Sequence, residues 1–287
     1  MGHFAIAGLQ LELSAQDNLP LVRSELARLK QRFPWVDMAV LAELSLFGTN
    51  KANAQPLPGP VEEDLCRIAQ DLDLWFIPGS IYQRDGDRIY NTTPVINPRG
   101  EVVARYRKMF PFLPYESGVT PGAEFVVFDV PDVGRFGVSI CYDMWFPETI
   151  RTLAWLGAEV ILHPSLTNTI DRDLELAIAR SSAALNQCYF FDINCAGRLG
   201  FGRSIVVGPD GSVIYQAGDG YEIIPVEVDL EHVRRTRRRG LHGLGQTLKS
   251  FRDTQVQFPP YLDGPARSSA LQALGPLEVP GRARDET

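Results

Sequence analysis

The stretch VSICYDMWFPET, residues 138–149, places a cysteine between the end of an apolar run and the start of a helix. The run FGVSI ends at Ile140, and Cys141 follows directly. Pro147 and Glu148 then open a helix, because proline and an acidic residue both suit a first helical turn. Cys141 therefore stands near the carboxyl end of a predicted strand. Ligands of open α/β sheets collect at that edge, which makes this cysteine a candidate site residue.

Predicted strands and helices alternate on both sides of this stretch. Short apolar runs predict strands over residues 4–12, 37–42, 74–82, 88–97, 101–107, 136–140, 159–165 and 188–194, and two more around the PDG turn within 204–218. Helical patterns cover residues 18–32, 60–72, 147–157 and 171–187. No linker divides the chain, so we expect one α/β domain of stacked sheets and helices over residues 1–257. Residues 258–287, rich in Pro, Gly and charge, predict an extended C-terminal arm.

Composition restricts the possible partners and compartment. The chain has 287 residues and a net charge of −7, which favours solubility and disfavours binding to nucleic acid or anionic membrane. No apolar stretch approaches the roughly 20 residues of a membrane span. The cysteines, Cys66, Cys141, Cys188 and Cys195, are scattered and fit no zinc spacing. We therefore expect no metal site, and a reducing cytoplasm as the compartment.

A basic run, RRTRRR at residues 234–239, raises the alternative of a nucleic-acid-binding protein. The acidic net charge and the lack of interleaved aromatic residues oppose this interpretation. A solvated helix face or a subunit contact explains the run better.

Three ionisable residues could activate the thiol of Cys141. Glu43 ends the apolar run MAVLAE, where burial would raise its pKa and make it a usable base. Lys108 ends VVARYRK and would supply a fixed positive charge, and Glu116 ends the proline-rich loop after it. A papain-like pair with His163 is the alternative, although a histidine inside the strand EVILHPS is more typical of a protein core.

These residues lie in three ordered motifs that together resemble the nitrilase superfamily of carbon–nitrogen hydrolases. The motifs are LAELSLFG, YRK followed eight residues later by PYE, and ICYDMWFPE, and the resemblance spans roughly residues 4–250. It implies a four-layer αββα sandwich whose sheets bring distant strand ends together. It also implies Cys141 as nucleophile, Glu43 as general base, Lys108 as stabiliser of oxyanion and thiolate, and Glu116 as a second, positioning carboxylate. No cofactor is expected.

The residues after the nucleophile bear on the substrate. Cys141-Tyr142-Asp143 looks like an amidase, whereas relatives that cleave nitriles usually carry Cys-Trp-Glu. Trp145 stands where ω-amidase-like patterns place an arginine and resembles the motif of carbamoylputrescine amidases. We therefore expect hydrolysis of a small linear amide through a cysteine thioester, releasing ammonia or an amine. Hydrolysis of an N-carbamoyl amine or of a nitrile are the alternatives.

Aromatic and apolar residues near the nucleophile suggest the substrate and subunit contacts. Tyr115, Tyr142 and Trp145 are the candidate substrate-binding residues, although Trp145 could equally pack in the core. The helix ETIRTLAWLG carries more apolar residues than one core face needs: Ile150, Leu153, Ala154 and Leu156. The family commonly pairs through this layer, so a homodimer or larger assembly is expected.

Overall fold

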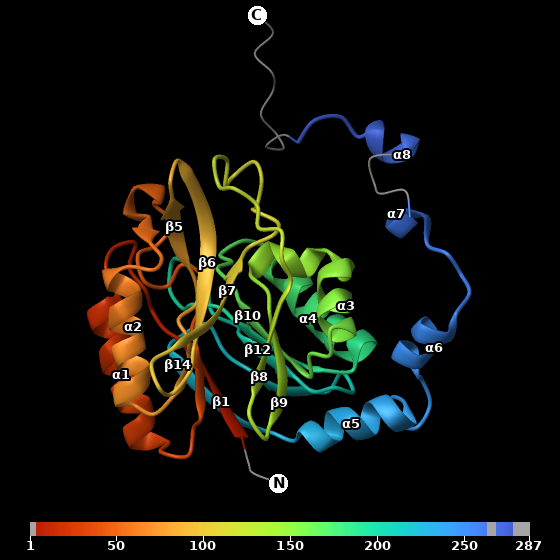
Figure 1. Ribbon diagram of the computed structural model, residues 1–287, viewed down its shortest axis with the longest axis horizontal. Helices are drawn as coiled ribbons and strands as arrows, with labels where there is room; N and C mark the ends of the chain where they lie inside the picture. The colour runs from red at the N-terminus through yellow and green to blue at the C-terminus, as the bar shows by residue number, and fades with distance from the viewer. Residues whose placement is uncertain (1–3, 263–267, 278–287) are drawn as a thin grey trace, which may run out of the picture.

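Two β-sheets face each other in the computed structural model, which describes residues 4–262 and 268–277. The first sheet occupies one half of the molecule (Figure 1). Its strand order is β14-β1-β2-β4-β6-β5-β3, and β7 pairs with β6. The strands are β1 (Phe4–Gln10), β2 (Met38–Val40), β3 (Gln55–Pro56), β4 (Trp75–Ile77), β5 (Ile81–Asp85), β6 (Arg88–Ile96), β7 (Val102–Arg107) and β14 (Glu222–Val228).

The second sheet runs in the order β13-β12-β11-β10-β9-β8. Its strands are β8 (Val126–Val130), β9 (Gly134–Val138), β10 (Val160–Pro164), β11 (Tyr189–Ile193), β12 (Ile205–Val207) and β13 (Val213–Gln216). The central strands β9, β10 and β11 are parallel, as β1, β2 and β4 are in the first sheet. Both sheets therefore place carboxyl ends of parallel strands along an edge, where a site can form.

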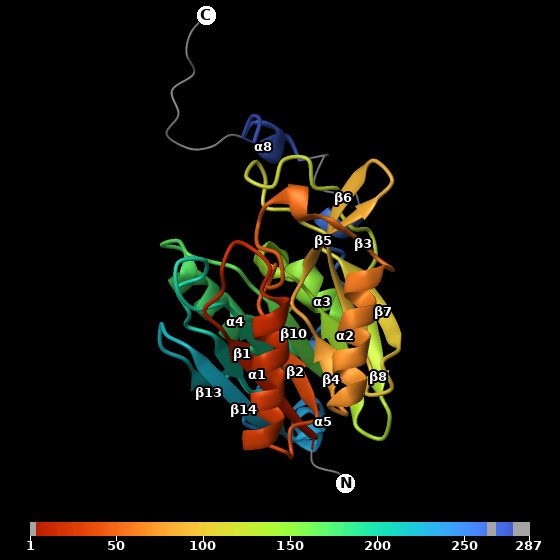
Figure 2. The ribbon, with the colours of Figure 1, turned by 90° about the vertical axis from the view of Figure 1, so that its left-hand side faces the viewer.

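Side-chain alternation along the strands produces four layers. In β1, Phe4 and Ile6 pack between the sheets, while Ala5 and Ala7 face the helices α1 (Leu19–Arg32) and α2 (Pro60–Asp71). The helices α3 (Pro147–Trp155) and α4 (Arg172–Asn186) cover the outer face of the second sheet. Figures 1 and 2 show the two helix layers on opposite sides of the paired sheets. The predicted αββα sandwich is confirmed.

The predicted strands need correction in two respects. The single strand expected over residues 74–82 is wrong: β4 and β5 are separated by Pro78-Gly79-Ser80, where Gly79 has a φ of +76°. The strands β8 and β14 were not predicted at all. The other predicted elements occur with ends displaced by a few residues.

The C-terminal part of the described chain consists of short helices on the outside of the sandwich. These are α5 (Leu230–Arg239), α6 (Thr247–Asp253), α7 (Pro259–Leu262) and α8 (Ser269–Gln272) (Figure 1). Part of the basic run is tied into the fold, since Arg234 pairs with Glu159 and Arg237 donates to the Ala158 carbonyl. The arm boundary at 258 stays a prediction, and residues 263–267 and 278–287 lie outside the described part. Within the described part, no helix is long and apolar enough to cross a membrane.

Candidate active site

The two sheets bring four predicted site residues together. Glu43 follows β2 of the first sheet, and Lys108 follows β7. Cys141 is the first residue of a 3₁₀ turn, η2 (Cys141–Trp145), after β9 of the second sheet. Glu116 lies in the loop between β7 and β8. Because the inner faces of the sheets pack on each other, these positions meet at one edge of the sandwich although they are far apart in sequence.

The Lys108 ammonium lies between two carboxylates. Its Nζ is 2.8 Å from Glu43 Oε1 and 2.7 Å from Glu116 Oε2. The Lys108 side chain is 1% exposed and that of Glu43 4%. Charges buried to this degree are tolerated only when they are paired and hydrogen-bonded, because desolvation of an unpaired charge costs several kcal/mol. The arrangement fixes one positive charge close to the Cys141 sulfur.

Two polar side chains on neighbouring strands complete this cluster. Asn91 of β6 donates from Nδ2 to Glu43 Oε1 at 2.7 Å and to Glu116 Oε1 at 3.4 Å. The Tyr82 hydroxyl of β5 donates to Glu116 Oε1 at 3.2 Å, and the Phe112 amide donates to Glu116 Oε2 at 2.6 Å. Both carboxylates are thus held by several donors, so their orientation does not depend on Lys108 alone.

The backbone of Cys141 adopts an uncommon conformation. Its φ is +47°, in the left-handed region that costs a non-glycine residue roughly 1–2 kcal/mol. The residue is 9% exposed. The backbone of Leu166, in the segment after β10, contacts the sulfur. Strain of this kind is found at functional sites, where the surrounding structure enforces it.

Burial and neighbouring charges set the ionisation of the cluster. Burial raises the pKa of the Cys141 thiol well above its usual value and the Glu43 charge raises it further, while Lys108 opposes both. Burial also raises the pKa of Glu43, against the opposing effects of Lys108 and Cys141. For Lys108, burial alone would lower the pKa, but the neighbouring carboxylates and the sulfur raise it well above normal. At rest the sulfur therefore keeps its proton. The expected stabilisation of a thiolate by Lys108 can apply only once that proton has been transferred.

Glu116 differs from Glu43 in its ionisation. Burial would raise its pKa, but the ion pair with Lys108 and the amide of Phe112 hold that pKa below its ordinary value. The two carboxylates thus have pKa values displaced in opposite directions, which is the pattern expected when one carries a proton during a reaction and the other stays charged.

Asp143 anchors the turn that carries Cys141. It accepts hydrogen bonds from the Tyr106 hydroxyl at 2.6 Å, the Ile140 amide at 2.8 Å and the Phe110 amide at 2.9 Å. Burial raises the pKa of this carboxyl to about 6. Tyr106 lies on β7, two residues before Lys108, so Asp143 connects the elements that carry the sulfur and the ammonium.

A buried ionic network supports the segment after β10. Arg172 bonds to Glu175 at 3.0 Å and to Asp192 at 2.8 Å, with all three side chains at most 3% exposed. Asp192 accepts from the Ser165 hydroxyl at 2.7 Å, and the Ser165 carbonyl accepts from the Glu43 amide at 3.1 Å. Burial raises the pKa of Glu175 to about 7. The network therefore reaches the backbone of the proposed base.

The backbone of Gly79 packs closely against that of Ala42, the residue before Glu43. A Cβ added at Gly79, whose φ is +76°, would lie 1.7 Å from the Ala42 carbonyl oxygen. Only glycine fits this position without displacing the backbone. The break between β4 and β5 thus holds the turn that presents Glu43.

The candidate substrate-binding residues lie in an aromatic cluster beside Glu116. Tyr142 is 4.9 Å from Phe112 between ring centroids, and Tyr115 is 4.8 Å from the same ring. Tyr115 is 59% exposed, whereas Trp145 is half-buried. Trp145 contacts the Tyr142 ring at 6.3 Å and also lines a groove with Phe251 and Tyr261 of the C-terminal segment. A role for these residues in substrate binding stays a prediction.

The alternative base, His163, is a buried core residue. Its Nδ1 lies 2.7 Å from the Ser139 hydroxyl, and burial lowers its pKa to about 4. The other buried thiols, Cys188 and Cys195, have pKa values raised to about 12 by burial. Within the described residues, no group of three or more His, Cys, Asp or Glu side chains has a metal-binding arrangement.

Sequence reasoning did not identify Tyr82, Asn91, Asp143 or the network around Arg172. One signal was present for Asn91: the polar triplet NTT, residues 91–93, stands inside an otherwise apolar strand and is fully buried. Buried polar residues need partners, and a buried asparagine in mid-strand therefore indicates a polar cluster. For Asp192 and Glu175 no local pattern distinguishes them from surface acids.

A two-sheet αββα sandwich with a buried cysteine beside a lysine and two glutamates is typical of the nitrilase superfamily. The family model for carbon–nitrogen hydrolases matches residues 4–238. The chain therefore belongs to the carbon–nitrogen hydrolase family, as its motifs implied, and is an enzyme of that type.

Several similar proteins are amidases. The chain is 33% identical to the omega-amidase NIT3 of Saccharomyces cerevisiae over 198 residues, 63% of this chain and 68% of that protein. It is 32% identical to the human omega-amidase NIT2 over 202 residues, 65% and 72% of the two chains. The crystal structure of S. cerevisiae Nit3, described as a member of branch 10 of the nitrilase superfamily, superposes with a TM-score of 0.76 at 30% identity, covering 82% of this chain and 93% of that one.

Proposed function

We propose that this enzyme hydrolyses the C–N bond of a small linear amide through a thioester on Cys141. The observation that carries the proposal is the Lys108 ammonium, held at 2.7–2.8 Å by two carboxylates of opposite pKa displacement beside a buried thiol. This set supplies a nucleophile, a base that can carry a proton, and a fixed positive charge for a developing oxyanion.

The first half-reaction forms the thioester. Glu43 takes the proton of the Cys141 thiol, and the sulfur attacks the amide carbonyl carbon. The oxyanion that develops is stabilised by the Lys108 ammonium and by the Tyr142 amide, which has no acceptor within η2 because it lies in the first turn. Glu43 then gives its proton to the nitrogen, the C–N bond breaks, and ammonia or an amine leaves.

The second half-reaction releases the acid. Water loses a proton to Glu43 and attacks the thioester carbonyl, and the same ammonium stabilises the second oxyanion. Collapse returns the proton to the sulfur and frees a carboxylic acid. Glu116 stays ionised throughout, and in this proposal it orients Lys108 together with the substrate amide or the attacking water.

Amides are favoured as substrates by the similar proteins and by the residues after the nucleophile. The omega-amidases NIT3 and NIT2 share about a third of the aligned residues with this chain. Tyr115 and Tyr142 lie beside Phe112, next to the Glu116 carboxylate, and would form an aromatic wall suited to a short aliphatic or aromatic acyl group. Trp145 stands where the ω-amidase pattern has an arginine. We therefore do not expect this position to bind a carboxylate group of the substrate.

The test is ammonia release from a panel of aliphatic and aromatic amides, N-carbamoyl amines and nitriles, combined with mass spectrometry of the trapped acyl-enzyme. We expect turnover of amides and an acyl adduct on the peptide that contains Cys141. Cys141→Ala should lose both, whereas Cys188→Ala, which removes another buried thiol, should retain both. Turnover restricted to nitriles, or an undiminished rate in Cys141→Ala, would refute the proposal.

We also propose that the chain forms a homodimer, on grounds that differ from those given by the sequence. Ile150 and Leu153 pack in the core of the chain itself and Ala154 is buried as well, so they are not the excess apolar surface. Trp155 of α3 is 74% exposed and Leu174 of α4 57%. Sedimentation equilibrium of the wild type and of Trp155→Glu tests this, with dissociation expected in the variant.

The described cysteines support a reducing compartment. All four are free thiols, as expected in the cytoplasm. Fractionation of cells that express the protein tests this assignment.

A further inference from the structure

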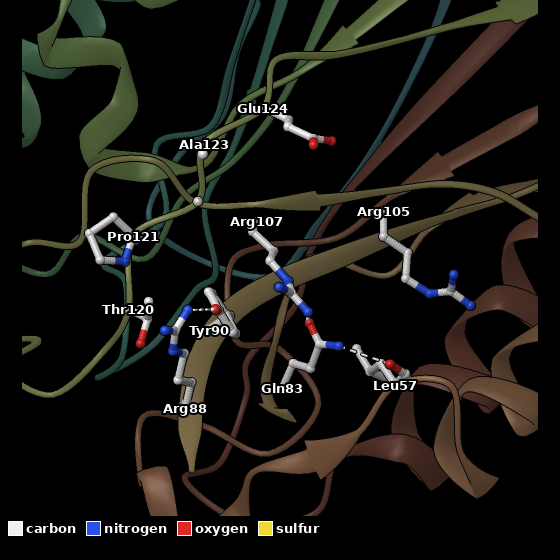
Figure 3. A pocket seen from close by; sticks show the side chains of 11 residues that line it. Leu57, Gln83, Arg88, Tyr90, Arg105, Arg107, Thr120, Pro121, Ala123 and Glu124 are labelled. Carbon is white, nitrogen blue, oxygen red and sulfur yellow. Dashed lines mark hydrogen bonds between the residues drawn. The ribbon is translucent and has the colours of Figure 1, made fainter. Parts of the chain in front are cut away.

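A pocket lies on the outer face of β5, β6 and β7, closed on one side by the segment Thr120–Glu124. Its volume is about 480 Å³. Figure 3 shows the side chains that line it, among them Arg88, Arg105 and Arg107. None of these residues belongs to the site described above.

Strand register places this pocket behind the active site. In the pairing of β5 with β6, Tyr82 lies opposite Asn91, and Gln83 lies opposite Tyr90. Successive side chains of a strand point to opposite faces. Tyr82 and Asn91 face Glu116, so Gln83 and Tyr90 face the pocket. On β7, Tyr106 reaches Asp143 in the site and its neighbours Arg105 and Arg107 line the pocket.

Two of the guanidinium groups are held in place by partners. Arg107 donates from Nε to Gln83 Oε1 at 3.0 Å and from Nη2 to Asp85 at 2.7 Å, and it stacks over the Tyr90 ring at 3.8 Å. Arg105 donates from Nε and Nη2 to the buried Glu62 at 2.8 and 2.7 Å. A guanidinium has five N–H donors, so each retains donors that these partners do not occupy.

Arg88 is an exposed arginine of the pocket, and the charge of Asp85, which lies opposite it in the β5–β6 pairing, acts on it. Its Nη1 donates to the Tyr90 hydroxyl at 3.4 Å, and no carboxylate of the described residues lies within ion-pair distance of it. The lining contains one acidic residue, Glu124, against three arginines.

We propose that this pocket binds a small oxyanion, a phosphate or a carboxylate. Guanidinium groups match the geometry of both, and two of the three are already oriented by Glu62, Asp85 and Gln83, which lowers the entropy cost of binding. Arg88 adds a third guanidinium, which has no carboxylate of the described residues within ion-pair distance. The ligand does not compete with a substrate at Cys141, because one sheet separates the two faces.

Isothermal titration calorimetry at low ionic strength tests the site, with inorganic phosphate in one arm and succinate in the other. The wild type should bind one of them in a saturable, one-to-one manner, and the tighter binder identifies the class. Removing a charged donor should weaken binding about tenfold or more, so Arg88→Gln and Arg107→Gln should both do so. Arg99→Gln removes an equal charge from the nearby β6–β7 turn, outside the pocket, and should bind as the wild type does.

Circular dichroism of each variant ensures that a loss of binding does not reflect unfolding. Absence of saturable heat in the wild type for both anions would overturn the proposal. Equal affinity in wild type, Arg88→Gln and Arg107→Gln would overturn it as well, because the anion would then be bound elsewhere, including at the Lys108 ammonium. Neither result depends on amide hydrolysis, so the proposed function is tested separately.

Discussion

Replacing Glu43 by glutamine should separate two properties of the site: turnover should fall while the thiol becomes more acidic. Glutamine keeps the size of the side chain and can still bond to Asn91, but it cannot accept the thiol proton. Loss of a general base typically costs about 10²–10⁴ in rate. We therefore expect kcat/KM to fall within that range with amide substrates.

The second property follows from charges acting on the sulfur. Burial and the Glu43 charge both raise the pKa of Cys141, while Lys108 and the backbone of Leu166 lower it. For unit charges about 5 Å apart at an effective dielectric constant of about 20, the interaction is about 3 kcal/mol. At 1.36 kcal/mol per pH unit, removing the Glu43 charge should lower the pKa of the thiol by about 2 units.

The assay is the pH dependence of Cys141 alkylation by iodoacetamide, read by mass spectrometry of the peptide so that the half-buried Cys66 does not interfere. Glu116→Gln is the matched control, since it neutralises the other carboxylate on Lys108. Its alkylation midpoint should move less than that of Glu43→Gln. An unchanged or raised midpoint in Glu43→Gln, or turnover within tenfold of the wild type, would refute the reasoning.

Three further predictions concern stability. Gly79→Ala should unfold at a much lower urea concentration than wild type because of its backbone clash, whereas Gly86→Ala, with φ +58° and no atom within 4 Å of the added Cβ, should lose only about 1–2 kcal/mol. The pKa of His163 is about 4 in the folded state, below its value in the unfolded state, so the free energy of unfolding should fall as the pH drops from about 6.5 to 4. The loss should reach about 3 kcal/mol in the wild type and be absent in His163→Gln. Arg172→Met should cost about 3–5 kcal/mol in urea denaturation, because Asp192 and its neighbouring glutamate would be left buried without their cation; a midpoint equal to that of wild type would contradict the network.

The layer architecture could be predicted from the sequence because buried parallel strands form continuous apolar runs. The runs that became β2, β10 and β11 are of this kind. β14 was missed because its sequence EIIPVEV contains Pro225, which usually argues against a central strand. The structure places it at the edge of its sheet, paired only with β1. The break at Gly79 was missed because both flanking segments are apolar, and the need for a glycine arises from a contact with Ala42, distant in sequence.

The candidate site, too, could be predicted from the sequence only in part. Glu43, Lys108, Glu116 and Cys141 lie in short motifs whose order can be recognised without knowing the fold. The partners that orient them come from cross-strand neighbours, such as Asn91 on β6, whose role exists only once the strands pair. Local sequence therefore indicated the candidate reacting groups, whereas their ionisation depends on the burial that packing creates.

In the proposed mechanism, the charge of the buried cluster changes position but not amount. The mechanism starts with Glu43 and Glu116 anionic, Lys108 cationic and the thiol neutral, so the cluster carries one net negative charge. Proton transfer moves that charge from Glu43 to the sulfur, and attack moves it to the substrate oxygen. An interior of low dielectric penalises the creation of charge more than its displacement beside a fixed cation. When Glu43 is neutral, only Glu116 pairs with Lys108, and the lowered pKa of Glu116 keeps it ionised at that step.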